Sequence, residues 1–153
     1  MTLLNYYAIV EDALRVVGIE PEEARCANEG EWQLQKGESE IYIDLWVPEN
    51  VNQWQYYVAE NPEPILQIMV PIGSLQTITN RELLMADLLQ LNAQLYYGAF
   101  IYNPQQNMVA LQYKRLATGI NQREVLEPVN ALGYYAENLS IMLKERFHLN
   151  LTS

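Results

Sequence analysis

The amino-acid sequence predicts an α+β two-layer sandwich, in which an antiparallel sheet of five or six strands carries helices on one face, in the order α-β(3)-α-β(2)-α. Three observations predict this class. Helical patterns of apolar residues open, divide and close the chain, segments of alternating polarity lie between them, and short connections favour antiparallel pairing. The 153 residues contain no repeat or linker, so we expect a single domain over residues 1–153.

The first helix is predicted by apolar residues that recur at spacings of four, three, four and three. These residues are Leu3, Tyr7, Val10, Leu14 and Val17. Gly18 follows them and can end the helix with a left-handed cap. Residues 19–30 (IEPEEARCANEG) are polar, contain a proline and have no periodic face, so we expect a connector across the surface there.

Several strands are predicted after this connector. The clearest is 41–47 (IYIDLWV), in which aliphatic residues alternate with ring-bearing and polar ones. Residues 32–35 precede it across the turn KGES, and residues 54–59 and 65–70 follow it. Because residues 32–35 could instead be a bulged extension of 41–47, the pattern leaves open whether three or four strands precede the next helix.

The second helix and a hairpin come next. Thr79 and Glu82 have the spacing of a capping box, and a leucine stripe continues the helix from them. The stripe consists of Leu84, Leu88, Leu91 and Leu95. Gly98 begins the hairpin, whose two strands flank the five-residue loop NPQQN.

A second capping pattern, Asn121 with Glu124, predicts the start of the third helix. Its apolar stripe consists of Val125, Val129, Leu132, Ala136, Leu139 and Leu143. Pro128 lies within this stripe and lacks the N–H group that an internal helical turn uses, so we expect the helix to be kinked or broken there.

The stretches LLQLNAQLYYGAFIYN (88–103) and NMVALQYKR (107–115), followed by a capped helix, resemble the bacterial YbjN-type proteins, which share the type III secretion chaperone-like fold. The features in common are the pair Leu91 and Asn92, the glycine entry at Gly98, the hairpin and the order of elements. The resemblance implies a small acidic domain that holds a protein partner or assists regulation. It implies no catalytic residue and no cofactor.

The net charge of −10 is concentrated in the first part of the chain: residues 1–60 contain 12 acidic and 3 basic residues, and residues 61–153 contain 7 and 6. Such a field repels phosphate backbones, so nucleic acid is not an expected partner. With one cysteine, no signal-peptide pattern and no apolar run of about 20 residues, we expect a cytoplasmic protein that does not enter a membrane.

The sequence shows no pattern of catalytic or metal-binding residues. The lone His148 and Cys26 lie far apart, no CxxC, HExxH or DxDxDG motif occurs, and the glycines never form a phosphate-binding loop. Asp44 has no second carboxylate nearby in the pattern, so we expect it to be solvated. Asn92 falls beside the leucine stripe, and we expect its amide to bond backbone groups where the helix ends and the hairpin begins.

The face of the sheet opposite the helices is the candidate binding surface. Strand alternation assigns to it rings, methionines and glutamines, which suit a protein interface. The assigned residues are Tyr42, Asp44, Trp46, Gln67, Met69, Phe100, Tyr102, Met108 and Gln112. A polypeptide partner, a second copy of the chain or the last helix wrapping round could cover this face. Four Tyr-Tyr pairs, including 96–97 and 134–135, add amphipathic surface but locate no site by themselves.

The leading hypothesis is therefore a non-enzymatic protein-binding domain, chaperone-like or regulatory, that holds a polypeptide or a second copy of itself. The alternative is a small-molecule-binding or cryptic enzymatic domain with a pocket between sheet and helices. That alternative requires Asn92 and Asp44 to line one cavity.

Overall fold

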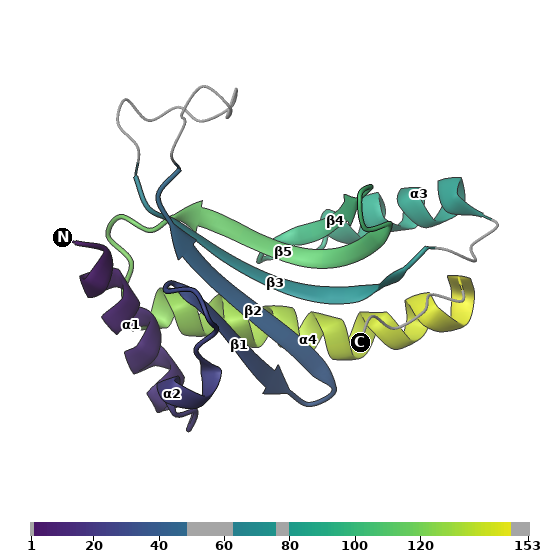
Figure 1. Cartoon of the computed structure of the whole chain (residues 1–153). Helices are drawn as coiled ribbons and strands as arrows, with labels where there is room; N and C mark the ends of the chain where they lie inside the picture. Colours follow the sequence, from purple (N-terminus) through teal and green to yellow (C-terminus); the bar gives the residue numbers. More distant parts are fainter. Residues whose placement is uncertain (1, 49–62, 76–79, 148–153) are drawn as a thin grey trace.

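One antiparallel sheet and three longer helices form the two layers of this computed structural model, which describes residues 2–48, 63–75 and 80–147 (Figure 1). The strand order in the sheet is β1-β2-β3-β5-β4. The elements are α1 (Leu3–Val16), α2 (Pro21–Ala24), β1 (Glu31–Lys36), β2 (Ser39–Trp46), β3 (Ile65–Ser74), α3 (Arg81–Asn92), β4 (Ala99–Asn103), β5 (Met108–Leu116) and α4 (Gln122–Phe147). The predicted fold class is confirmed, and the strand expected at 54–59 lies outside the described residues.

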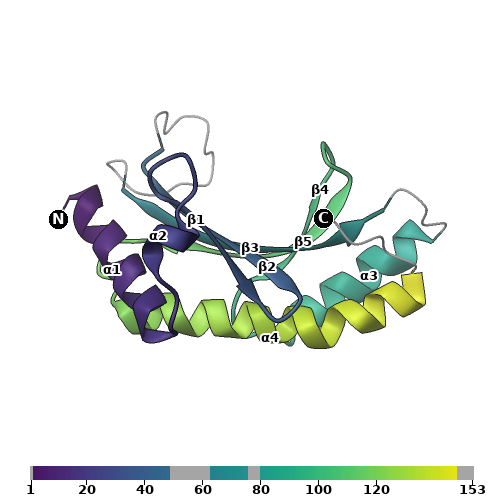
Figure 2. The ribbon, with the colours of Figure 1, turned by 60° about the horizontal axis from the view of Figure 1, so that its bottom comes forward.

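The helices α1, α3 and α4 all lie on one side of the sheet, with α4 running beneath it for most of its length (Figure 2). The core between the layers is mainly aliphatic with a few aromatic rings, and the described residues include no buried polar or charged side chain. Ile41, Ile43 and Leu45 of β2 meet this core with at most 2 % of their surface exposed. No helix in the described residues is both long and apolar enough to cross a bilayer.

The first helix ends one residue earlier than its apolar pattern suggests. Val17 is the C-cap residue, and 43 % of its surface is exposed, so its predicted place on the buried face is wrong. Gly18 adopts φ +83°, as its predicted role requires. Val10 and Leu14 are buried as predicted, and Tyr6 and Ala13 are buried beside them.

The connector at 19–30 contains more structure than its composition predicts. Pro21–Ala24 form the single helical turn α2, in which Pro21 takes the first position and both terminal residues are buried. Arg25 then makes a β-bridge with Trp32. The segment is the expected surface connector, since most of its residues are exposed, but its composition predicts neither the helical turn nor the bridge. A proline suits the first helical turn because the missing N–H group would have no partner there.

The segment around 32–35 forms a strand of its own. In β1, Glu31 to Lys36 pair antiparallel with β2 in unbroken register, from Glu31 opposite Asp44 to Lys36 opposite Ser39. The two strands are joined by a tight turn in which Gly37 adopts φ +61°. The bulged extension considered for this segment does not occur, and three strands precede α3 within the described residues.

The last helix continues through its proline. The main-chain N–H of Glu124 donates to Asn121 Oδ1 at 3.0 Å, which caps α4 as the pattern predicts. The helix then runs without a break from Gln122 to Phe147. Pro128 is buried together with Val129, so packing of the apolar stripe against the sheet offsets the one lost hydrogen bond. The predicted break at Pro128 is wrong.

Candidate functional site

The sheet side that faces away from α1, α3 and α4, here called the open face, is built by the register of four strands. Tyr42 lies opposite Met69 and Met69 opposite Gln112, and the next row joins Asp44, Gln67 and Lys114. Most of these side chains are half-buried rather than fully exposed. The open face consists of Tyr42, Asp44, Trp46, Ile65, Gln67, Met69, Ala99, Ile101, Met108, Gln112 and Lys114.

Phe100 and Tyr102 do not belong to the open face, and their predicted place there is wrong. In β4, Phe100 pairs with Leu111 and Tyr102 with Val109, both of which point toward the helices. Phe100 is only 6 % exposed and belongs to the core, whereas the hydroxyl of Tyr102 contacts Asn107 Oδ1 at 2.9 Å in the hairpin loop. Every residue of the sequence AFIY (99–102) can be buried. The pattern therefore does not reveal whether the odd-numbered or the even-numbered residues of this strand face the helices.

The centre of the open face is organised by two side-chain contacts. Gln112 Nε2 donates a hydrogen bond to Gln67 Oε1 at 3.1 Å across β5 and β3. Lys114 Nζ lies 5.8 Å from the centre of the Trp46 ring, within cation–π range. Burial lowers the pKa of Lys114. Sequence reasoning missed Lys114, although extending the alternation of β5 two residues past Gln112 would have included it.

Acidic side chains lie where the open face adjoins the edge strand β1. Glu31 lies opposite Asp44, and burial together with the negative charge of Glu31 raises the pKa of the Asp44 carboxyl. The Tyr42 hydroxyl donates to Glu40 Oε2 at 2.9 Å. Burial, followed by the charges of Glu31 and Asp44, raises the pKa of the Cys26 thiol. A thiol held in its protonated form is a weak nucleophile, so Cys26 is not activated for covalent chemistry.

These residues do not form a metal site. Within the described ranges, no three His, Cys, Asp or Glu side chains gather closely enough to hold an ion. The neighbouring carboxylates Glu22 and Glu23 lie on α2 with both side chains exposed, and His148 lies outside the described residues.

Asn92 and Gly98 hold the helix-to-hairpin junction on the other side of the sheet. Asn92 Oδ1 accepts from the Phe100 N–H at 2.6 Å, and Asn92 Nδ2 donates to the Phe100 carbonyl at 3.3 Å. Gly98 adopts φ +68°, and a side chain there would meet the Gln112 carbonyl. Asn92 and Asp44 are thus separated by the sheet and do not line one cavity.

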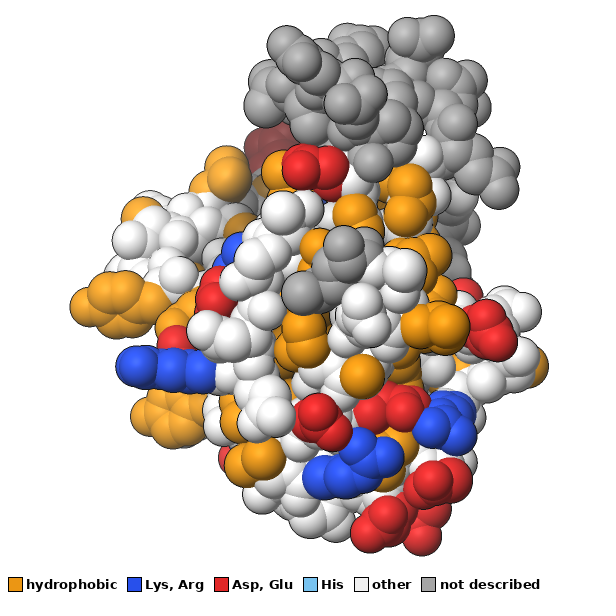
Figure 3. Space-filling view, turned by 90° about the vertical axis from the view of Figure 1, so that its left-hand side faces the viewer, with side chains coloured by type: hydrophobic (Ala, Val, Ile, Leu, Met, Phe, Trp, Pro, Cys, Tyr) orange, Lys and Arg blue, Asp and Glu red, His pale blue; other side chains and the backbone are white. Residues whose placement is uncertain are grey.

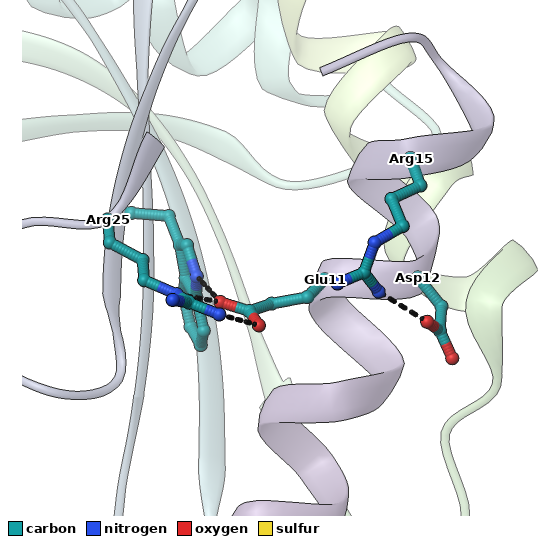
Figure 4. A network of polar contacts seen from close by, with 5 residues as sticks. Glu11, Asp12, Arg15 and Arg25 are labelled. Atoms are coloured by element: carbon teal, nitrogen blue, oxygen red, sulfur yellow. Dashed lines mark hydrogen bonds and ion pairs between the residues drawn. The ribbon is translucent and has the colours of Figure 1, made fainter. Parts of the chain in front are cut away.

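A polar network secures the β1 edge to α1 (Figure 4). Glu11 accepts two hydrogen bonds from the guanidinium of Arg25, both 2.7 Å long, and a third from Trp32 Nε1 at 3.0 Å. The hydrogen bond from Arg25 holds the pKa of Glu11 below its ordinary value. Seen from this end of the molecule, several acidic and basic side chains lie side by side in the lower part of the view (Figure 3). The hydrogen bonds from Arg25 and Trp32 to Glu11 therefore hold the β1 edge of the sheet against α1.

Comparison with known proteins identifies the fold. No family model matches the chain, and no curated protein matches it. Three solved structures with similar chains are those of the ExsC–ExsE complex (13% identity, 91% of this chain and 93% of that chain, TM-score 0.59), the HopA1–SchA chaperone–effector complex (11%, 92% and 98%, 0.60) and the ExoT–SpcS complex from Pseudomonas aeruginosa (10%, 86% and 95%, 0.50). At these identities the likeness concerns the backbone, and the chain shares its fold with chains in these complexes.

Proposed function

We propose that this chain is a non-enzymatic protein-binding domain, chaperone-like or regulatory, that holds a polypeptide partner against its open face. The observation that carries this proposal is the composition of that face. Trp46, Tyr42 and Met69 lie half-buried on the side of the sheet away from α1, α3 and α4. Aromatic and methionine side chains of this kind are concentrated in protein interfaces.

Two further features support the proposal. Chains of similar fold occur in a chaperone–effector complex, and α4 lies against the opposite side of the sheet, so it does not wrap round to cover the open face. A second copy of this chain is the other occupant that we propose for the face. We also propose, from the residues at 88–115, that the chain is a YbjN-type protein working in the cytoplasm.

The small-molecule or enzymatic alternative receives no support from the same residues. It required Asn92 and Asp44 to line a common pocket, and the sheet separates them. The raised pKa of the Cys26 thiol gives no activated nucleophile. Protein binding therefore fits the arrangement better.

The test compares immobilised wild type with Trp46→Glu in capture from the native lysate, with quantitative mass spectrometry of the bound proteins. Leu4→Glu is the matched control, because it adds the same charge at an apolar residue on α1 that is 69 % exposed. We expect specific partners to be lost from Trp46→Glu and retained by Leu4→Glu.

Light scattering on the same three proteins distinguishes the two proposed occupants. A drop in mass for Trp46→Glu alone indicates a second copy on the open face. Equal recovery of every partner and equal mass in all three proteins would refute the open face as a binding surface. Circular dichroism confirms that each variant is folded.

A further inference from the structure

A groove lined by four tyrosines lies between the α3–β4 connection and the middle of α4. Its lining residues are Tyr96, Tyr97, Asn130, Ala131, Tyr134 and Tyr135, and its volume is about 650 Å³. Two Tyr-Tyr pairs that are distant in the sequence thus meet in space, and the small Ala131 of α4 also lines the groove. The groove is separate from the open face, because α4 packs against the other side of the sheet.

The walls of the groove are fixed by hydrogen bonds. The Tyr97 hydroxyl donates to Glu127 Oε2 at 2.7 Å, and the Tyr96 N–H donates to the Tyr135 hydroxyl at 3.1 Å. Both bonds tie the α3–β4 connection to α4. The rings of Tyr97 and Tyr135 are therefore held in place before a ligand binds, which reduces the entropy lost on binding.

The rings present edges and faces at steep angles to one another. Tyr134 and Tyr135 pack with centroids 6.4 Å apart and an interplanar angle of 66°. Tyr97 packs on Tyr113 in the same manner, at 5.9 Å and 67°. Tyr96 and Tyr134 are 94 % and 64 % exposed, so two rings protrude as ridges beside a partly buried floor.

The groove offers hydrogen-bond donors. The Asn130 amide is oriented by Lys36, whose ammonium group only donates and contacts Asn130 Oδ1, so Nδ2 is the amide group left to donate. Within the described part of the chain, Asn130 Nδ2 and the hydroxyls of Tyr96 and Tyr134 make no hydrogen bond.

The carboxylate of Glu127 beside the groove is already engaged. Glu127 contacts both Tyr97 and the guanidinium of Arg123, the latter at 2.5 Å from Nε to Oε1. A basic side chain on a ligand would therefore find no free carboxylate at Glu127. The groove instead suits a ligand with apolar rings and hydrogen-bond acceptors.

We propose that this groove binds a proline-rich segment of another polypeptide in the polyproline II conformation. Proline has no N–H group and presents only carbonyl acceptors beside an apolar ring, which matches donors set among tyrosine rings. A polyproline II segment is preformed in water and leaves its carbonyls unpaired. Aromatic-lined grooves are a recurrent mode of recognising it. An added β-strand would need a free strand edge, which a helix and a loop do not supply.

Fluorescence anisotropy of a fluorescein-labelled decaproline peptide, titrated with the full chain, tests the proposal. A glycine-serine decapeptide of equal length serves as the flexible control peptide. We expect saturable binding of decaproline and at least about a tenfold loss of affinity in Tyr134→Ala, because exposed tyrosines dominate interfaces of this kind. Ile141→Ala, at a 60 % exposed residue of the same helix outside the groove, should retain the affinity within about twofold.

Three results would overturn the proposal: no saturable binding of decaproline to the wild type, equal binding of the glycine-serine peptide, or unchanged affinity in both Tyr134→Ala and Tyr96→Ala. Both tyrosines are mostly exposed, so circular dichroism should show these variants folded. Trp46→Glu should leave the decaproline affinity unchanged, since Trp46 lies on the open face. That result separates this groove from the binding surface proposed above.

Discussion

The two sides of the sheet hold their side chains by different means. On the side that faces the helices, Ile43, Ile68 and Leu111 are completely buried among other aliphatic groups. On the open face, Trp46 lies under Lys114 and stays half-buried. On the side of the helices, burial of aliphatic area stabilises the fold and fixes the layers. On the open face, the side chains make individual contacts and remain accessible to a partner. A change on the first side should affect folding, and a change on the second should affect recognition.

The largest expected effect compares two neighbours on β4. Phe100→Ala removes a ring that is 94 % buried in the core and should lower the free energy of unfolding by about 3–5 kcal/mol. Ile101→Ala removes a half-buried side chain on the open face and should cost about 1 kcal/mol. Urea denaturation followed by circular dichroism measures both. Equal losses in the two variants would contradict the assignment of the two sides.

Strands β2 and β4 show how much of the fold could be predicted from the sequence. In β2, Asp44 interrupts the ring-bearing positions while Ile41 and Ile43 occupy the others, so only one parity can face a dry core. In β4, both Phe100 and Ile101 can be buried, so local polarity does not decide. The register with β5 decides it, and a register is set by tertiary pairing rather than by the segment itself.

A middle-sized effect is expected at the junction between α3 and β4, on the side of the helices. Asn92→Ala removes both hydrogen bonds to the main chain of Phe100 and should cost about 2 kcal/mol, because it leaves partly buried backbone groups without partners. Gln90→Ala is the control, since Gln90 is exposed on the same helix. We expect the free energy of unfolding of the control to lie within about 0.5 kcal/mol of the wild-type value.

If Asn92→Ala were as stable as Gln90→Ala, the amide would not be what holds the hairpin to α3.

Asn92 could be identified from the sequence because an amide beside a leucine stripe needs partners. The tyrosine groove could not, because Tyr96 and Tyr134 lie far apart in the chain. Only the packing of the α3–β4 connection on α4 brings them together.

The smallest expected effect is at Asp44 on the open face, and its sign differs from those above. Burial and the charge of Glu31 raise the pKa of Asp44 in the folded protein, so the folded state binds this proton more tightly than the unfolded chain does. Below the ordinary carboxyl pKa of about 4, both states are protonated and nothing is lost. As the pH rises through the raised pKa, the folded state must carry a poorly solvated charge, and stability falls.

Asp44→Asn removes that charge and keeps the size of the side chain. We expect the variant to be more stable than the wild type at pH 7, by less than the loss predicted for Asn92→Ala. The difference should shrink as the pH falls toward about 4. Urea denaturation of both proteins across this range measures the difference. Glu38→Gln changes the net charge equally at an exposed residue of the same hairpin, so it separates a local effect from general repulsion within an acidic chain. A gain that is equal in the two variants, or that does not vary with pH, would show that Asp44 is as well solvated as an ordinary surface carboxylate.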